Sequence, residues 1–98
     1  MRNLNEVILS DLPTLVQFSA EWCDPCKSMT PIVENIKKKV EDKATVLKID
    51  VDENKDLTDQ FRIQTVPTFI IFKQGQPMWR HSGVIAEKEL LAMLENYY

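Results

Sequence analysis

Apolar residues recur along this chain with two different periods, one typical of helices and one typical of strands. From residue 29 onward the apolar positions follow at offsets of 3, 4, 7 and 11 residues, as in a helix with one buried stripe: Met29, Ile32, Val33, Ile36 and Val40. Residues 14–19 and 45–51 are short, mostly apolar runs. Such runs predict strands whose two faces are both covered, as in a parallel sheet.

Two shorter segments predict helices of only a few turns. Residues 3–10 place three apolar side chains on one helical face. Asn54 is positioned to cap a second short helix, in which Leu57 and Phe61 are neighbours one turn apart.

The last third of the chain predicts a hairpin and a final helix. Residues 67–72 and 78–82 have the composition of strands, and the polar turn at 73–76 contains Gly75. Residues 87–97 repeat apolar positions with a helical period and carry two glutamates in the first turn, where the helix dipole favours negative charge.

The order of these elements is helix, strand, helix, strand, helix, strand, strand, helix. A helical crossover joins the first two strands, so we expect them to be parallel with a right-handed connection. The last two strands form an antiparallel hairpin, which makes the sheet mixed. With helices to cover both faces, the pattern predicts an α/β three-layer sandwich around a mixed sheet of about four strands.

Composition places the chain among globular proteins of one domain, spanning residues 1–98. Hydrophobic residues make up 44% and charged residues 28% of the sequence. The formal net charge of −3 argues against binding to nucleic acid, which requires a basic face. The charge-free stretches are far shorter than the roughly 20 apolar residues of a membrane helix, so we expect no membrane partner.

The first residues lack the apolar core of a secretory signal, and we therefore expect a cytoplasmic protein, or one whose targeting segment has been removed. The chain has two cysteines, Cys23 and Cys26. In a reducing compartment such a pair is a poor structural crosslink, and its spacing indicates redox or metal chemistry.

The two cysteines lie where the first predicted strand ends and the long helix begins. Cys23 falls at the helix N-terminus, where free N–H groups and the helix dipole favour a thiolate, and we expect it to be exposed. Cys26 is one turn further along, shielded and close enough to form a disulfide with Cys23. Pro25 suits the first turn because its missing N–H has no partner to lose. A thiolate with a second thiol beside it is sufficient for thiol–disulfide exchange.

Two metal-binding interpretations are weaker. Zinc requires four ligands, and the chain offers two thiols and one histidine, His81, on a distant strand. Asp50, Asp52 and Glu53 could suggest a cation site, but they lack an EF-hand pattern and are more typical of a solvated turn.

The sequence resembles the thioredoxin family in several spaced motifs, which run from about residue 15 to the C-terminus. They are residues 18–27 with Pro31 in the following helix, 48–52, 66–68, 72–75 and Gly83. The resemblance implies the thioredoxin fold and a thiol–disulfide oxidoreductase that reduces disulfides in partner proteins. It also implies no bound cofactor, because a reversible Cys23–Cys26 disulfide carries the electrons, and recharging by an NADPH-dependent flavoprotein reductase.

The resemblance also implies roles for individual residues. Cys23 would be the nucleophile that attacks a substrate disulfide, and Cys26 the thiol that resolves the mixed disulfide. Trp22 would belong to the docking surface. Val66 and Pro67 would be joined by a cis peptide bond facing the cysteines, with the Val66 backbone pairing to an extended substrate. Gly83 would leave space for the backbone of that substrate.

The sequence departs from the family pattern at three places. Asp24 replaces a glycine, and its charge should make the site slightly more reducing. Gln17 replaces a buried aspartate, which removes an internal proton acceptor for Cys26. Lys48 loses its carboxylate partner and should turn outward or toward the sulfur atoms. Too few residues precede the first strand for the family's N-terminal edge strand, which we expect to be missing or very short.

Two alternative functions remain open at this point. One is a disulfide oxidase or isomerase on the same fold, against which the Asp-Pro pair between the cysteines and the lack of a signal segment both count. The other is a non-enzymatic binding module whose cysteines are secondary. A Cys23→Ser variant with full biological activity would favour the binding module.

Overall fold

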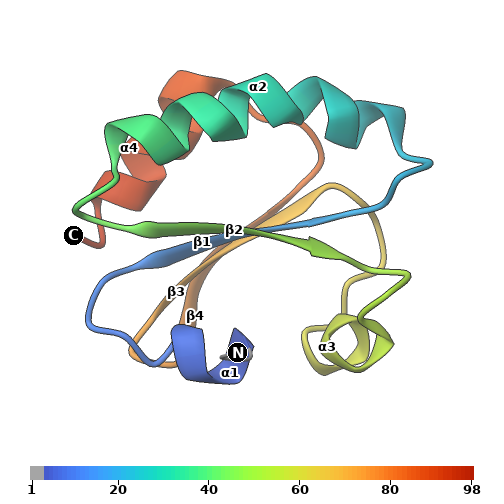
Figure 1. Cartoon of the computed structure of the whole chain (residues 1–98), viewed down its shortest axis with the longest axis horizontal. Helices are drawn as coiled ribbons and strands as arrows, with labels where there is room; N and C mark the ends of the chain where they lie inside the picture. Colours follow the sequence, from blue (N-terminus) through green and yellow to red (C-terminus); the bar gives the residue numbers. More distant parts are fainter. Residues whose placement is uncertain (1–3) are drawn as a thin grey trace.

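A mixed sheet of four strands forms the middle layer of the computed structural model, which describes residues 4–98 (Figure 1). The strands are β1 (Thr14–Ser19), β2 (Thr45–Asp50), β3 (Thr68–Lys73) and β4 (Gln76–Ser82). Their order across the sheet is β2–β1–β3–β4. β1 pairs in parallel with β2 and antiparallel with β3, and β3 pairs antiparallel with β4. The predicted mixed sheet is therefore confirmed.

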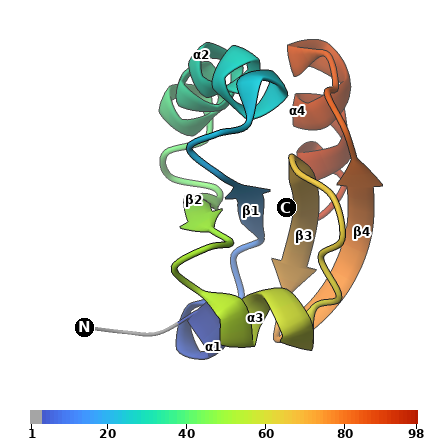
Figure 2. The same ribbon diagram turned by 90° about the vertical axis from the view of Figure 1, so that its right-hand side faces the viewer.

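Helices cover both faces of this sheet, as the three-layer prediction requires. They are α1 (Leu4–Val7), α2 (Asp24–Lys39), α3 (Lys55–Gln60) and α4 (Glu87–Glu95). Figure 2 shows α2 and α4 on one face and the short α1 and α3 on the other. Within residues 4–98 no strand precedes β1, so β2 is an edge of the sheet, as expected from the short N-terminus.

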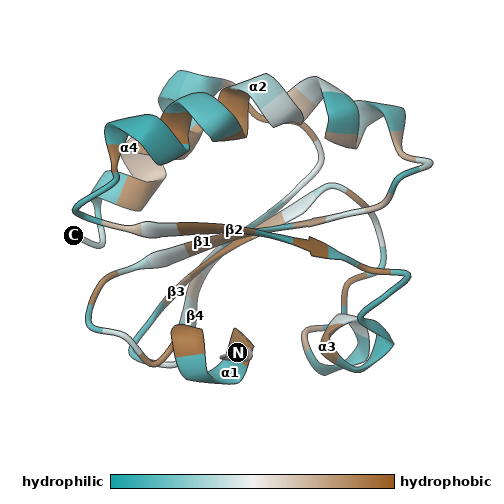
Figure 3. Ribbon diagram, viewed as in Figure 1, coloured by the Kyte–Doolittle hydropathy of each residue, from teal (hydrophilic) through white to brown (hydrophobic). Residues whose placement is uncertain are grey.

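The two larger apolar clusters of the core lie one on each face of the sheet. Alternation along β1 sends Leu15 to the cluster under α2 and α4, and sends Val16 and Phe18 to the cluster over α1 and α3. All six residues of β1 are buried, because this strand lies inside the sheet and is covered on both faces. Figure 3 shows apolar residues along the strands and on the helix surfaces that face them.

The first helix is shorter than the predicted span of residues 3–10. α1 ends at Val7, and Asn3 lies outside the described residues. After it, the N–H groups of Leu9 and Ser10 bond to carbonyls three residues earlier, which is the tighter geometry of a helix end. Leu9 is 65% exposed, so it adds no buried contact that would extend the helix.

Other boundaries moved by one or two residues. β3 begins after Pro67, which has no N–H for the ladder, and β4 begins at Gln76 rather than at residue 78. The turn between them holds Gln74 and Gly75 at positive φ, as tight hairpin turns require. α4 ends at Glu95 instead of residue 97.

Asn54 lies at the predicted N-cap position but does not cap the helix with its side chain. Asn54 is the N-cap residue of α3, but its side chain makes no capping hydrogen bond. Its amide instead donates to the carbonyl oxygen of Asp50 at 2.9 Å. This bond ties the start of α3 to the end of β2, close to the two cysteines.

Candidate active site

Cys23 and Cys26 are joined by a disulfide at the N-terminus of α2. Cys23 is the N-cap residue, with an extended backbone, and its Sγ accepts a hydrogen bond from the N–H of Cys26 at 3.1 Å. Pro25 occupies the first turn, where a missing N–H costs no bond. The Cys26 N–H and the positive end of the helix dipole therefore both point at the sulfur of Cys23. This arrangement stabilises a thiolate on Cys23 when the disulfide opens.

Cys23 is more buried than expected from its place at a helix end. It is 3% exposed and Cys26 is 1% exposed, so the expected contrast in exposure is not present in the disulfide form. The cysteines pack with Ala20, Val51 and Val66, residues from three other segments of the chain. Sequence periodicity could not predict that the cysteines are buried, because Ala20, Val51 and Val66 all lie outside α2.

The peptide bond between Val66 and Pro67 is cis, as the resemblance implied, and it lies beside the disulfide. The Cys23 Sγ is 3.7 Å from the carbonyl oxygen of Val66. A disulfide sulfur carries no proton, so this is a contact in the oxidised form, and the thiol of reduced Cys23 has an acceptor at the same place.

Gly83 is held next to the same cis bond. Its N–H donates to the carbonyl oxygen of Pro67 at 2.7 Å. Its φ is +99°, a conformation that favours glycine, and the space in which a side chain would lie is open. Gly83 thus leaves room beside Val66 and Pro67, where the resemblance places the backbone of a substrate.

Trp22 lies on the surface next to the cysteines. It is 68% exposed, which excludes a role as a core aromatic residue. Its indole N–H donates to an oxygen of Asp52 at 2.8 Å. Asp50 in turn accepts the backbone N–H groups of Asp52 and Glu53 at 2.8 and 3.3 Å. These carboxylates therefore serve as hydrogen-bond acceptors that shape the turn after β2 and orient the indole.

The structure gives no support to a metal centre. Among residues 4–98, no three His, Cys, Asp or Glu side chains are grouped as metal ligands. His81 lies on β4, stacks on Trp79 with ring centres 5.9 Å apart, and bonds through Nε2 to the carbonyl oxygen of Val84 at 3.1 Å. No helix in the described part of the chain is long and apolar enough to cross a membrane.

Gln17 is buried beneath α2, at 1% exposure. Its Nε2 atom has no hydrogen-bond partner within residues 4–98. The residue lines a cavity of about 80 Å³ between α2 and β2, together with Lys48, its neighbour in the parallel pair. An amide cannot ionise at physiological pH, so Gln17 offers Cys26 no carboxylate.

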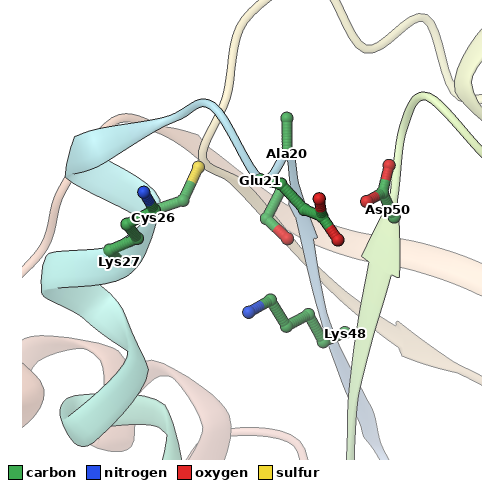
Figure 4. Close-up of a pocket in the computed structure, with 7 residues that line it drawn as sticks. Ala20, Glu21, Cys26, Lys27, Lys48 and Asp50 are labelled. Carbon is green, nitrogen blue, oxygen red and sulfur yellow. The ribbon is translucent and has the colours of Figure 1, made fainter.

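A larger cavity, of about 380 Å³, lies beside Cys26. Figure 4 shows the side chain of Lys48 extending across it toward α2, while Glu21 and Asp50 direct their carboxylates toward one another at its other side. Lys48 is exposed and points toward α2, and whether its charge acts on the sulfur atoms stays a prediction. Glu21 was missed by the sequence analysis, although its place two residues before Cys23 was a signal that could have found it.

Asp24 points away from these cavities into solvent. Its side chain is 93% exposed, and its nearest charged partner is the Lys27 ammonium at 3.8 Å. Its influence on the sulfur atoms is therefore screened by water.

Comparisons with known proteins agree with this geometry. The thioredoxin family model matches residues 1–96. The chain is 42% identical over 91 residues to the thioredoxin of Rickettsia bellii, covering 93% of this chain and 87% of that protein. It is 42% identical over 92 residues to the thioredoxin of Alicyclobacillus acidocaldarius, covering 94% and 88% of the two chains.

Solved structures extend the likeness to the fold. A point mutant of a thioredoxin from Halobacterium salinarum superimposes with a TM-score of 0.88 at 34% identity, covering 96% of this chain and 81% of that one. The germline-specific thioredoxin Deadhead of Drosophila melanogaster gives a TM-score of 0.84 at 33% identity, with coverage of 93% and 86%. The thioredoxin fold expected from the sequence is therefore confirmed.

Proposed function

Because this chain belongs to the thioredoxin family and is thus a thiol–disulfide oxidoreductase, we propose that it works as a reductase of disulfides in partner proteins. The observation that carries the proposal is the place of the cysteine pair. Cys23 caps α2, with the N–H of Cys26 on its sulfur, and it faces the cis bond between Val66 and Pro67. A helix end that stabilises the thiolate keeps Cys23 reactive as a nucleophile once the pair is reduced, and the redox potential then decides the direction of exchange.

The reaction proceeds in two exchanges of one sulfur for another. The Cys23 thiolate attacks one sulfur of the substrate disulfide, forms a mixed disulfide and releases the other substrate sulfur as a thiolate, which takes up a proton. Cys26 then loses its proton and attacks the Cys23 sulfur. The Cys23–Cys26 disulfide forms, and the second substrate sulfur leaves as a thiolate. Two electrons pass from the cysteine pair to the substrate, and no bound cofactor takes part.

The substrate would lie over the surface formed by Trp22, Val66 and Gly83. The exposed indole provides apolar contact area. An extended segment would pair with the backbone of Val66, and the open space at Gly83 accommodates the main chain. Recharging of the oxidised pair would come from an NADPH-dependent flavoprotein reductase, by analogy with the family. The cytoplasmic localisation expected from the sequence stays a prediction.

Reduction of a protein disulfide in the presence of dithiothreitol tests the proposal. We expect the wild-type protein to accelerate reduction of insulin and the Cys23→Ser variant to give only the uncatalysed rate. The Cys26→Ser variant should trap a mixed disulfide with the substrate, because the resolving sulfur is gone. Failure of the wild type to accelerate reduction would exclude the reductase function.

The redox potential of the cysteine pair separates this function from that of an oxidase or isomerase. A reductase requires a potential more negative than those of the disulfides it reduces. Equilibration of the pair with glutathione at known ratios, followed by quantification of reduced and oxidised protein, gives this value directly.

A further inference from the structure

The second exchange of the proposed reductase requires a proton acceptor for Cys26. The thiolate, not the thiol, attacks a disulfide, and Cys26 is 1% exposed. The buried residue beneath α2 is Gln17, whose amide cannot take up this proton. The acceptor must therefore be found elsewhere.

The cavity of about 380 Å³ beside Cys26 is the route by which the proton can leave. Its walls come from the end of β1 and the loop after it, from β2 and from the first turn of α2. Its volume is sufficient for several water molecules, and charged side chains line it. The titratable groups on it are Glu21 in the loop, Cys26 and Lys27 on α2, and Lys48 and Asp50 on β2 (Figure 4).

Of these groups only Glu21 and Asp50 are carboxylates that can accept a proton. Asp50 already accepts two backbone N–H groups, from Asp52 and Glu53, and both bonds go to its Oδ1 atom. Glu21 makes no hydrogen bond or ion pair within residues 4–98. Its oxygens are therefore available to water in the cavity.

We propose that Glu21 accepts the proton of Cys26 through water in this cavity and so drives the resolving step. The inference rests on the proposed reductase function. The thiol proton of Cys26 passes to Glu21 by way of water, and the thiolate attacks the Cys23 sulfur of the mixed disulfide. The Cys23–substrate bond breaks, the substrate thiolate leaves, and the proton on Glu21 returns to solvent. The ammonium group of Lys48, on the same cavity, favours the Cys26 thiolate as it forms.

The two exchanges can be followed separately with an aromatic disulfide reagent. Reduced protein is mixed rapidly with dithiobis(nitrobenzoate): Cys23 releases the first coloured thiolate, and Cys26 releases the second when it resolves the mixed disulfide. We expect Glu21→Gln to leave the first release unchanged and to slow the second about tenfold near pH 6. The two proteins should converge near pH 9, since hydroxide then removes the proton directly.

Two further variants control for charge and for structure. Glu34→Gln removes the same charge from an exposed residue of α2 that does not line the cavity of Cys26, and we expect no change in either release. Glu21→Asp keeps a carboxylate and should retain most of the second rate. A purely electrostatic effect of Glu21→Gln has the opposite sign, because removal of negative charge near Cys26 favours its thiolate.

Three results would overturn the proposal: a second release that is equal in Glu21→Gln and the wild type at every pH, slowing of both releases to the same extent, or equal slowing by Glu34→Gln. Failure of the reductase function has a different signature. In that case both releases from the reagent occur as described, while the protein does not accelerate reduction of insulin.

Discussion

The side of the sheet that faces α2 and α4 has two halves of different construction. In one half Leu15 packs with Ile36, Leu90 and Leu94, each of them fully buried. In the other half the same face of β1 carries Gln17 and is bordered by two cavities, one at the first turn of α2 and one further along the same helix. Two positions along one strand therefore separate a close-packed region from a hollow, polar one. The first holds the layers together, and the second gives a buried sulfur access to water.

The largest effect should come from a cavity made in the packed half. Ile36→Ala removes a fully buried side chain, and we expect the free energy of unfolding to fall by about 2 to 5 kcal/mol. The rate of disulfide exchange by the folded protein should not change. Unfolding in urea and the insulin assay measure the two quantities. The matched control is Leu9→Ala, at a 65% exposed position, which should change stability by no more than about 0.5 kcal/mol.

A charge placed in the hollow half should lower stability less and raise the rate of the chemistry. Gln17→Asp provides an internal carboxylate next to Cys26, and we expect faster resolution of the mixed disulfide. Burial raises the pKa of such a carboxyl group above its unfolded value. The oxidised protein should therefore be less stable by about 1 to 3 kcal/mol at neutral pH. This deficit should shrink as pH falls through the raised pKa and should be gone below the unfolded value of about 4.

Gln17→Asn is the neutral control of the same length as aspartate. It should give no acceleration, and any loss of stability it causes should not depend on pH. The double variant Gln17→Asp, Glu21→Gln provides a sharper test, because an internal acceptor makes Glu21 dispensable. Equal stability of Gln17→Asp and Gln17→Asn between pH 4 and 7 would show that burial at position 17 does not disfavour an ionised carboxylate.

A smaller effect is expected at the solvent-exposed edge of the hollow half. Asp24→Gly removes a carboxylate near Cys23, which should raise the redox potential because the thiolate is no longer repelled. Since the side chain is 93% exposed and next to Lys27, the change should not exceed about 10 mV at physiological ionic strength. Measurements at low and high salt should show the difference decreasing with salt. A difference that salt does not change would point to the backbone freedom of glycine instead.

The smallest effect concerns an exposed ion pair between the two helices of the packed half. Hydrogen bonds from Lys39 at 2.8 Å and Asn35 at 3.2 Å lower the pKa of Glu87 from its usual value of 4.5. Its contribution to stability is therefore present above pH 4.5 and is lost as pH falls through the lowered pKa. Melting of Glu87→Gln and wild type should differ slightly at pH 7 and coincide at about pH 2. Glu89→Gln, in the same helical turn but without an ion pair within residues 4–98, should show a smaller difference.

The sequence predicted those parts of the fold that depend on periodicity within one segment. The apolar stripe of α2 and the run of β1 each decide their own structure, because burial of these residues requires only that a partner layer exists. The short α1 was overestimated, since a periodic pattern does not reveal that Leu9 is 65% exposed. Asn54 occupies the predicted N-cap position, but the sequence does not reveal that its side chain bonds to the carbonyl oxygen of Asp50 and not to the first turn of α3.

The site was less predictable than the fold for the same reason. The position of the cysteines at a helix end follows from local sequence, whereas their burial depends on Val51 and Val66 from other segments. The cavity that joins Glu21 to Cys26 exists only because β2 lies beside β1. Neither spacing nor composition carries that information.

The pairing of β1 has a consequence for how the chain acquires its structure during synthesis. This interior strand pairs through Thr14 with Thr45 on one side and with Phe72 on the other. A ribosome therefore releases β1, α2 and β2 well before β3. Until then the emerging chain holds two strands with unpaired backbone edges and uncovered apolar faces. Closure of the sheet must bring together residues 58 positions apart in the sequence, from Thr14 to Phe72, and such distant contacts slow folding. The nascent chain is thus most prone to association with chaperones, or with other nascent chains, in the interval before its third strand emerges.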